Sequence, residues 1–176
     1  MEENWYTITG AIDVNTAHGL ITYVNGLIYN SDIKKLKIIL SSNGGDVDSA
    51  IRIYSYLKSL SIEIEIIALS QIDSAANIIY AAGNKRIAIK GCRFFVHEGT
   101  FTNANQTATL HVHEEILLIF KELMKRHIKI LSEGTGISEK EIMKLLKEST
   151  ILTAERAKEL GIVHEIVEKI PLTRQV

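Results

Sequence analysis

The sequence predicts an α/β protein built on a mainly parallel β-sheet with helices on its faces. Short strand-like runs alternate with helical ones along its 176 residues. One run, Leu36–Leu40, is continuously apolar, as expected of a strand that is covered on both faces. The single proline further indicates a chain made mostly of regular elements, whose turns are built by Gly, Asn, Asp and Ser.

The first part of the chain alternates strands and helices. Trp5–Thr9 is predicted to be a strand ended by Gly10, and Asn15 is expected to cap a helix that runs to Asn30. The strand Leu36–Leu40 leads into a turn and then a second helix. The apolar face of that helix is formed by Ile51, Tyr54, Leu57 and Leu60.

The middle of the chain predicts three strands around one short helix. Isoleucines at 62, 64 and 66 alternate with glutamates, which is typical of a strand. Ser74–Ala82 is expected to form a short helix stopped by Gly83. Two further strands, Arg86–Ile89 and Phe94–His97, follow it.

The last part of the chain is mostly helical. After a polar loop at Phe101–Gln106, one long helix is predicted from Thr107 to Ser132, ended by Gly134. Two more helices and a last strand are expected at Ser138–Lys147, Thr153–Leu160 and Ile162–Val167. The long helix has a wide apolar face, which packs either in the core or against a neighbouring subunit.

Composition excludes several classes of function. Twenty basic and twenty-one acidic residues give a net charge of −1, so neither nucleic acid nor an anionic membrane is an expected partner. The one cysteine, Cys92, has no partner for a disulfide, which suits a reducing compartment. The acidic start predicts no secretory signal, and the expected location is the cytoplasm.

Three features could carry chemistry. The turn Asn43–Asp46 follows a buried strand and contains two glycines that let the backbone approach a ligand, although a Gly-Gly pair alone more often marks a plain strand-to-helix turn. Ser74 stands at a strand-to-helix corner and is either a helix cap or a nucleophile. His97 ends a strand, where a histidine is either structural or a general base.

A metal site is not expected. His111 and His113 are two residues apart, so on a helix they point away from each other. His111 and Glu115 could share a face, but two ligands are too few for a closed site.

In their order and spacing, these features resemble the Clp protease proteolytic subunit family, which are serine peptidases of the ClpP/crotonase-like fold. Nearly the whole chain, from Trp5 to Val167, takes part in the resemblance. The stretches that carry it are Tyr6–Asp13, Ser42–Val47, Ser74, Ala81–Gly83, Phe95–Glu98, Thr135–Gly136 and Leu152–Glu155.

The resemblance implies a single domain of residues 1–176, with stacked βαβ units forming a head (1–98 and 135–176) and a protruding long handle helix (about 99–134). It implies that Ser74 is the nucleophile, His97 its general base, and the N–H groups of Gly45 and Ala75 the oxyanion hole. It further implies a homo-oligomeric ring that cleaves peptides or unfolded proteins, an ATP-dependent unfoldase as partner, and no cofactor or metal.

The sequence departs from the family beside this site. Where the family has the aspartate of its catalytic triad, this chain has Ser149, and Asp73 stands where a small residue is usual. Asp73 or Glu148 could replace the acid, and Asp73 could instead cap the following helix. Two alternatives to an active peptidase are therefore a catalytically silent assembly subunit and, on the same fold, a CoA-using crotonase-type enzyme.

Overall fold

The chain folds around a seven-stranded sheet. The structure is a computed structural model and describes residues 4–99 and 109–170. The strands are β1 (Asn4–Thr9), β2 (Lys35–Ser42), β3 (Glu63–Asp73), β4 (Lys85–Ile89), β5 (Arg93–Val96), β6 (Thr150–Thr153) and β7 (Glu165–Val167). The helices are α1 (Val14–Asn30), α2 (Val47–Ser59), α3 (Ala76–Tyr80), α4 (Leu110–Thr135), α5 (Glu139–Lys147) and α6 (Ala154–Glu159). The α/β class predicted from the sequence is confirmed.

The sheet divides at β3. Its main path runs β1-β2-β3-β4-β7 with parallel pairing throughout. The first part of β3, Glu65–Ala68, pairs with β4, whereas its last part, Gln71–Asp73, pairs with β5. β5 in turn pairs with β6, and this pair is antiparallel. The long β3 therefore belongs to both halves of the sheet, which meet between Ala68 and Gln71, and its carboxyl end lies beside β5.

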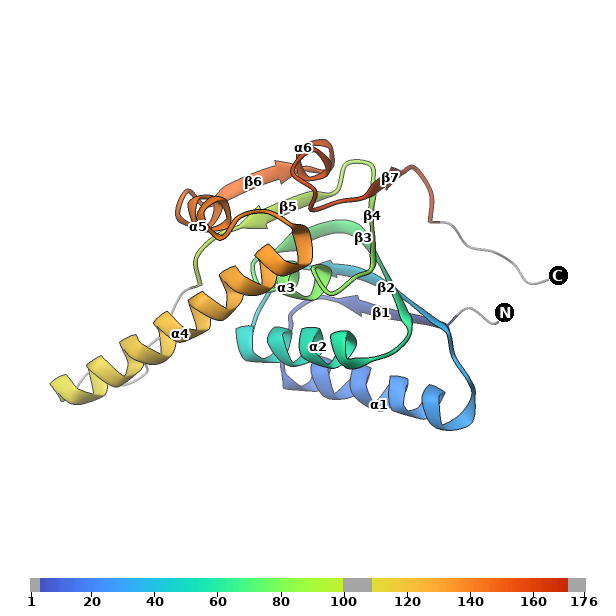
Figure 1. Ribbon diagram of the computed structural model, residues 1–176, viewed down its shortest axis with the longest axis horizontal. Coiled ribbons are helices and arrows are strands. Elements are labelled where there is room, and N and C mark those ends of the chain that lie inside the picture. The colour runs from blue at the N-terminus through green and yellow to red at the C-terminus, as the bar shows by residue number, and fades with distance from the viewer. Residues whose placement is uncertain (1–3, 100–108, 171–176) are drawn as a thin grey trace.

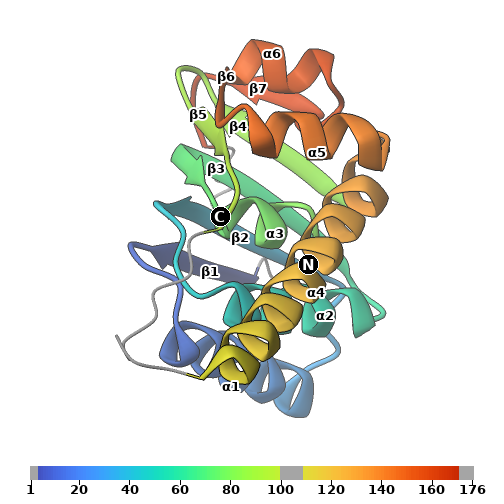
Figure 2. The ribbon, with the colours of Figure 1, turned by 90° about the vertical axis from the view of Figure 1, so that its left-hand side faces the viewer.

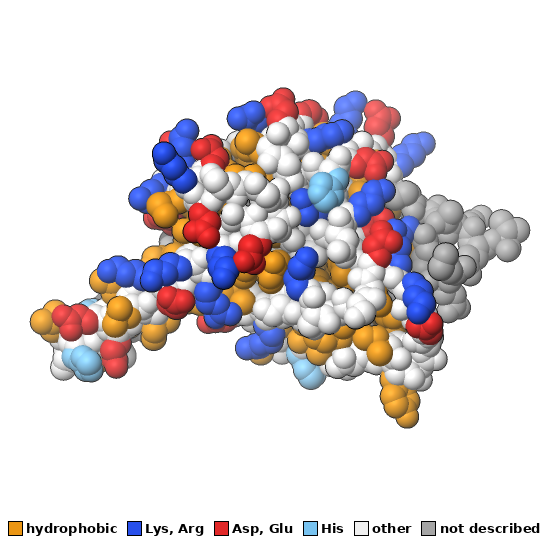
Figure 3. Space-filling model, viewed as in Figure 1, with side chains coloured by type: hydrophobic (Ala, Val, Ile, Leu, Met, Phe, Trp, Pro, Cys, Tyr) orange, Lys and Arg blue, Asp and Glu red, His pale blue; other side chains and the backbone are white. Residues whose placement is uncertain are grey.

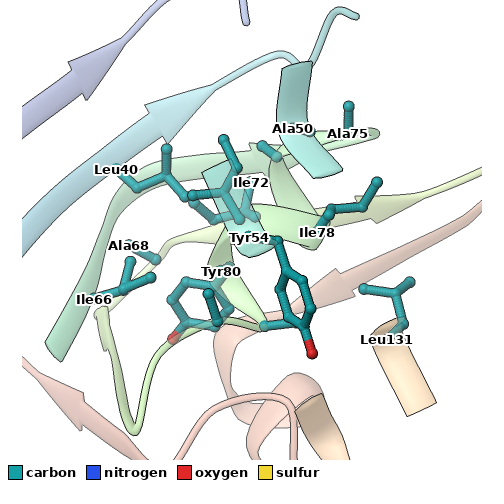
Figure 4. Packing of buried hydrophobic residues seen from close by; sticks show 14 of the residues in the cluster. Leu40, Ala50, Tyr54, Ile66, Ala68, Ile72, Ala75, Ile78, Tyr80 and Leu131 are labelled. Atoms are coloured by element: carbon teal, nitrogen blue, oxygen red, sulfur yellow. The ribbon is translucent and has the colours of Figure 1, made fainter. Parts of the chain in front are cut away.

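Helices pack on the sheet through apolar residues that alternate along β2 and β3. Leu36, Ile38 and Leu40 of β2 are fully buried, and α1 and α2 cover this part of the sheet (Figure 1). Side chains of α2, α3 and α4 join the strand residues in one continuous core (Figure 4). At the opposite end of the molecule, α5 and α6 lie beside β5, β6 and β7 (Figure 2).

The long helix α4 is half docked and half free. Its carboxyl-terminal half packs on the core through His127, Ile130 and Leu131. Its first half protrudes from the body (Figure 1), where Leu118 and Ile119 are 66% and 59% exposed. Apolar side chains alternate with charged ones along this protruding half (Figure 3).

Several predicted boundaries were wrong. The first helix is capped by Asp13, whose Oδ1 accepts from Thr16 N at 2.8 Å, and not by Asn15. The long helix continues through Gly134 to Thr135 and ends at Gly136, which has φ +80°. The strand β6 was not predicted, and it makes part of the sheet antiparallel.

Two predicted features lie partly or wholly outside the residues that the structure describes. The polar loop Phe101–Gln106 and the predicted first residues of the long helix lie outside the described residues. Within residues 4–99 and 109–170, no helix combines the length and apolar character needed to cross a bilayer.

Candidate active site

Three neighbouring strands end at one edge of the sheet. Because β2, β3 and β5 pair in parallel, their carboxyl ends lie together, as do the segments that follow them. Those segments contain Gly44 and Gly45 after β2, Ser74 after β3, and His97 after β5. In parallel sheets this edge is where ligands usually bind.

The glycine turn after β2 is held against both Ser74 and Ile12, which lies between β1 and α1. Gly44 N donates to Ser42 Oγ at 3.0 Å, and Ile12 N donates to the Gly44 carbonyl at 2.9 Å. The φ angles of Gly44 and Gly45 are +91° and +146°. A Cβ on Gly44 would lie 2.7 Å from Ser74 Cβ, and one on Gly45 would collide with the Ile12 carbonyl. The turn therefore requires glycine at both positions.

Ser74 occupies a strained corner. Its φ of +55° lies in the left-handed region, which costs a non-glycine residue of order 1–3 kcal/mol. Ser74 N donates to Phe95 O at 2.8 Å, which ties the corner to β5. The cap of α3 is Ala75, without a side-chain cap bond, so the interpretation of Ser74 as a helix cap is wrong.

The buried side-chain amide of Asn77 stabilises this corner. Asn77 Nδ2 lies 3.2 Å from Ile72 O, 3.0 Å from Ser74 O and 3.0 Å from Phe95 O. The side chain thus links the end of β3, the corner and the end of β5 through three carbonyl oxygens. Sequence reasoning missed this role, although a lone asparagine in a run of alanine and isoleucine was a signal for it.

Two backbone N–H groups beside Ser74 have no acceptor among the described residues. They belong to Gly45 and Ala75. The Cβ position of Gly44 lies 3.2 Å from Ala75 N, so the two amides lie on adjoining turns. Unpaired backbone donors are uncommon in folded proteins and are available to a ligand.

His97 is half-buried and follows β5, whose Phe95 carbonyl accepts from Ser74 N. Asp73 pairs with Phe95 in the β3–β5 register, so His97 lies two residues beyond the last residue pair of these strands. The ring stacks on Phe95 with centroids 4.5 Å apart and planes 19° from parallel. Within the described residues, no hydrogen bond joins the His97 ring to the Ser74 hydroxyl.

Asp73 has a different partner from those considered above. Its side chain is buried, and its Oδ2 accepts from Arg93 Nη2 at 2.8 Å. It therefore neither caps α3 nor bonds to His97 in this structure. Burial, and next the charge of Asp73, raise the pKa of the neighbouring Cys92 thiol to about 12.

Ser149 lies in the turn between α5 and β6. The antiparallel β5–β6 register ends with Val96 opposite Thr150, so His97 and Ser149 each lie one residue beyond this last pair. Ser149 has φ +49° and is exposed. Glu148, the neighbouring carboxylate, is exposed as well.

The predicted histidine–glutamate pair lies far out on α4. His111 Nε2 is 3.6 Å from Glu115 Oε1, and both side chains are more than half exposed. No group of three His, Cys, Asp or Glu side chains able to hold a metal was found in the part of the chain that the structure describes.

Comparison with known proteins identifies the family of this chain. The family profile described as Clp protease matches residues 1–170. This chain belongs to the Clp protease family.

Two Clp relatives illustrate the likeness. The ATP-dependent Clp protease proteolytic subunit 2 of Frankia casuarinae is 28% identical over 137 residues, which is 77% of this chain and 62% of the relative. The chain thus matches less than two thirds of that relative's length. An aspartate-for-asparagine mutant of ClpP1 from Listeria monocytogenes superimposes with a TM-score of 0.83 at 23% identity, covering 94% of this chain and 92% of the other. The ClpP/crotonase-like fold expected from the sequence is confirmed.

Proposed function

We propose that this Clp-family chain is a serine endopeptidase that cleaves peptides or unfolded proteins inside a ring-shaped chamber. The observation that carries the proposal is the strained Ser74 corner, with the unpaired amides of Gly45 and Ala75 on either side. A strained backbone costs stability, as does an unpaired donor on a buried residue such as Ala75, and such features persist where function requires them.

Each residue has a role in the proposed reaction. His97 takes the proton of the Ser74 hydroxyl as the Ser74 oxygen attacks the peptide carbonyl carbon. The N–H groups of Gly45 and Ala75 donate to the oxyanion that forms. His97 then protonates the leaving amine, and a water molecule, deprotonated by His97, releases the acyl group from Ser74.

The third position of the proposed triad lacks the carboxylate that would stabilise a protonated His97. Ser149 occupies it, and a hydroxyl stabilises an imidazolium less than a carboxylate does. Replacing the acid of a serine triad by a neutral group can lower kcat by about four orders of magnitude. Asp73 is the other candidate for this position, but its carboxylate is paired with Arg93. We therefore expect slow turnover.

Assembly into a ring is proposed from the protruding half of α4. Leu110, Leu117, Leu118 and Ile119 are at least 50% exposed there, which suits contact with further copies of the chain. In this proposal residues 1–176 form one domain, with residues 99–134 as the handle. An ATP-dependent unfoldase would deliver substrates, and the buried free thiol of Cys92 suits the cytoplasm.

A catalytically silent assembly subunit is the second candidate. It is favoured by the exposed serine at the acid's position, since no described carboxylate bonds to His97. Such a subunit would join a ring in which an active paralogue cleaves the substrate.

Cleavage of a fluorogenic peptide and of unfolded casein by the assembled chain separates the two. We expect slow cleavage that is abolished in Ser74→Ala and retained in Ser70→Ala, which changes an exposed serine of β3, the strand before Ser74. No cleavage by the assembled chain, together with activity after mixing with an active paralogue, would favour the silent subunit. Cleavage that survives Ser74→Ala would refute the assigned nucleophile.

A further inference from the structure

A buried histidine that the proposed mechanism does not use lies on α4. His127 is 3% exposed and lies in the half of the helix that packs on the core. Neither of its ring nitrogens has a hydrogen-bond partner among the described residues. A buried polar group left unpaired costs about 1–3 kcal/mol, so the position demands an explanation.

The segment after β5 runs along the same face of α4. A Cβ on Gly99 would lie 3.6 Å from Phe120 Cε2 and 3.9 Å from Met124 Sδ. His127 follows Met124 by three residues and so lies on that face of the helix, nearer the core. His97 precedes Gly99 by two residues in the chain, which brings it toward His127.

The electrostatics agree with this placement. Burial, and next the neighbouring His97, lower the pKa of His127 to about 4. His127 is therefore neutral at neutral pH. A neutral imidazole has one nitrogen that donates a hydrogen bond and one that accepts.

His97 needs such an acceptor. A general base that turns one ring nitrogen toward the serine carries its proton on the other nitrogen, and an acceptor there fixes the tautomer and the ring orientation. In this chain Asp73 is paired with Arg93 and Ser149 is exposed. Among the described residues, Asp73 Oδ1 and Glu65 Oε1 are also buried without a hydrogen-bond partner, but the other oxygen of each carboxylate is paired. His127 is the side chain of this group whose polar atoms are all unpaired.

We propose that His127 is a positioning residue for His97, accepting a hydrogen bond from the His97 ring directly or across one water molecule. The inference rests on the proposed function, because it gives His97 the role of general base. A neutral acceptor orients the ring but stabilises its charged form less than a carboxylate would, which agrees with slow turnover.

Three variants of the full chain test this proposal by their rate of reaction with a fluorophosphonate probe at Ser74. His127→Met removes both nitrogens, His127→Gln keeps an amide donor and acceptor, and Ile130→Val is a conservative control one turn further along the helix. We expect at least a tenfold loss of rate in His127→Met, recovery to within threefold in His127→Gln, and no change in the control. A normal rate in His127→Met, or an equal loss in His127→Gln, would overturn the proposal.

A second measurement does not depend on activity. The ¹⁵N chemical shifts of the His97 ring at pH 7.5 report which nitrogen carries the proton. We expect one tautomer in the parent and in His127→Gln, and a mixture in His127→Met. The same tautomer population in all three proteins would overturn the inference, even if the parent reacts with no probe and the proposed function fails.

Discussion

Alanine at position 44 should separate backbone strain from the close approach of the glycine turn to Ser74. Gly44 and Gly91 have nearly the same left-handed backbone, with φ of +91° and +85°. Each Gly→Ala change therefore costs about 1–2 kcal/mol from the backbone alone. A Cβ on Gly91 meets nothing within 4 Å, whereas one on Gly44 lies 2.7 Å from Ser74 Cβ and 2.8 Å from Asp73 O.

That crowding sets the expected difference. Backbone and Cβ atoms cannot yield as the end of a flexible side chain can, so the turn must shift, and overpacking of this kind costs about 1–3 kcal/mol. Gly44→Ala should therefore lower the free energy of unfolding by about 1–3 kcal/mol more than Gly91→Ala does. For a chain of this size the gap in Tm is roughly 2–12 °C.

Urea and thermal unfolding at one protein concentration measure the gap, and the fluorophosphonate rate at Ser74 measures its effect on the site. We expect Gly44→Ala to lose most of that rate and Gly91→Ala to keep it. Equal stability of the two variants, or a normal probe rate in Gly44→Ala, would refute the assigned contact between the turn and Ser74.

Three further predictions concern other parts of the molecule. Gly134→Ala should destabilise the protein by about 1–3 kcal/mol, because its Cβ would lie 2.6 Å from Ala81 O. Gly26→Ala, in open space on α1, should be neutral or stabilising by up to about 1 kcal/mol. Urea unfolding of the two variants measures this difference. The Cys92 thiol, with its pKa raised to about 12, should resist iodoacetamide at pH 8 until the protein is unfolded, as intact mass would show. The pKa of His127 falls from 6.5 to about 4 on folding, so the unfolded chain binds more protons than the folded one between these pH values. This group should therefore lower the free energy of unfolding by up to about 3 kcal/mol as pH falls from 7 to 4. Urea unfolding of His127→Met should lack that loss.

Much of the fold follows from local patterns. The apolar run at the centre of β2, the alternating residues of β3 and the glycine turn between β2 and α2 are each visible in a few consecutive residues. Parallel pairing then places the ends of β2, β3 and β5 at one edge of the sheet, and the segments that contain Gly45, Ser74 and His97 follow these ends.

Boundaries that depend on packing could not be predicted in this way. Gly134 resembles a helix stop, but it lies inside α4. The residue there is glycine because Ala81 packs so closely that it leaves no room for a side chain. The strand β6 has four residues, of which only Leu152 is fully buried, so its pattern was too short to recognise. Asp13 and Asn15 can both cap a helix, and local sequence does not distinguish them.

The supports of the site depend on contacts between distant segments. Arg93 reaches Asp73 across 20 positions, and Asn77 reaches Phe95 across 18. His127 comes near His97 only because the segment after β5 runs along α4. These residues have no motif, and their roles appear only in three dimensions.

The most direct test of the proposed site is to map the residue that a fluorophosphonate probe modifies in the folded, assembled protein. We expect one adduct, on Ser74, that is absent from Ser74→Ala and strongly reduced in His97→Ala. An assembled protein without an adduct, or an adduct on another serine that persists in Ser74→Ala, would contradict the account.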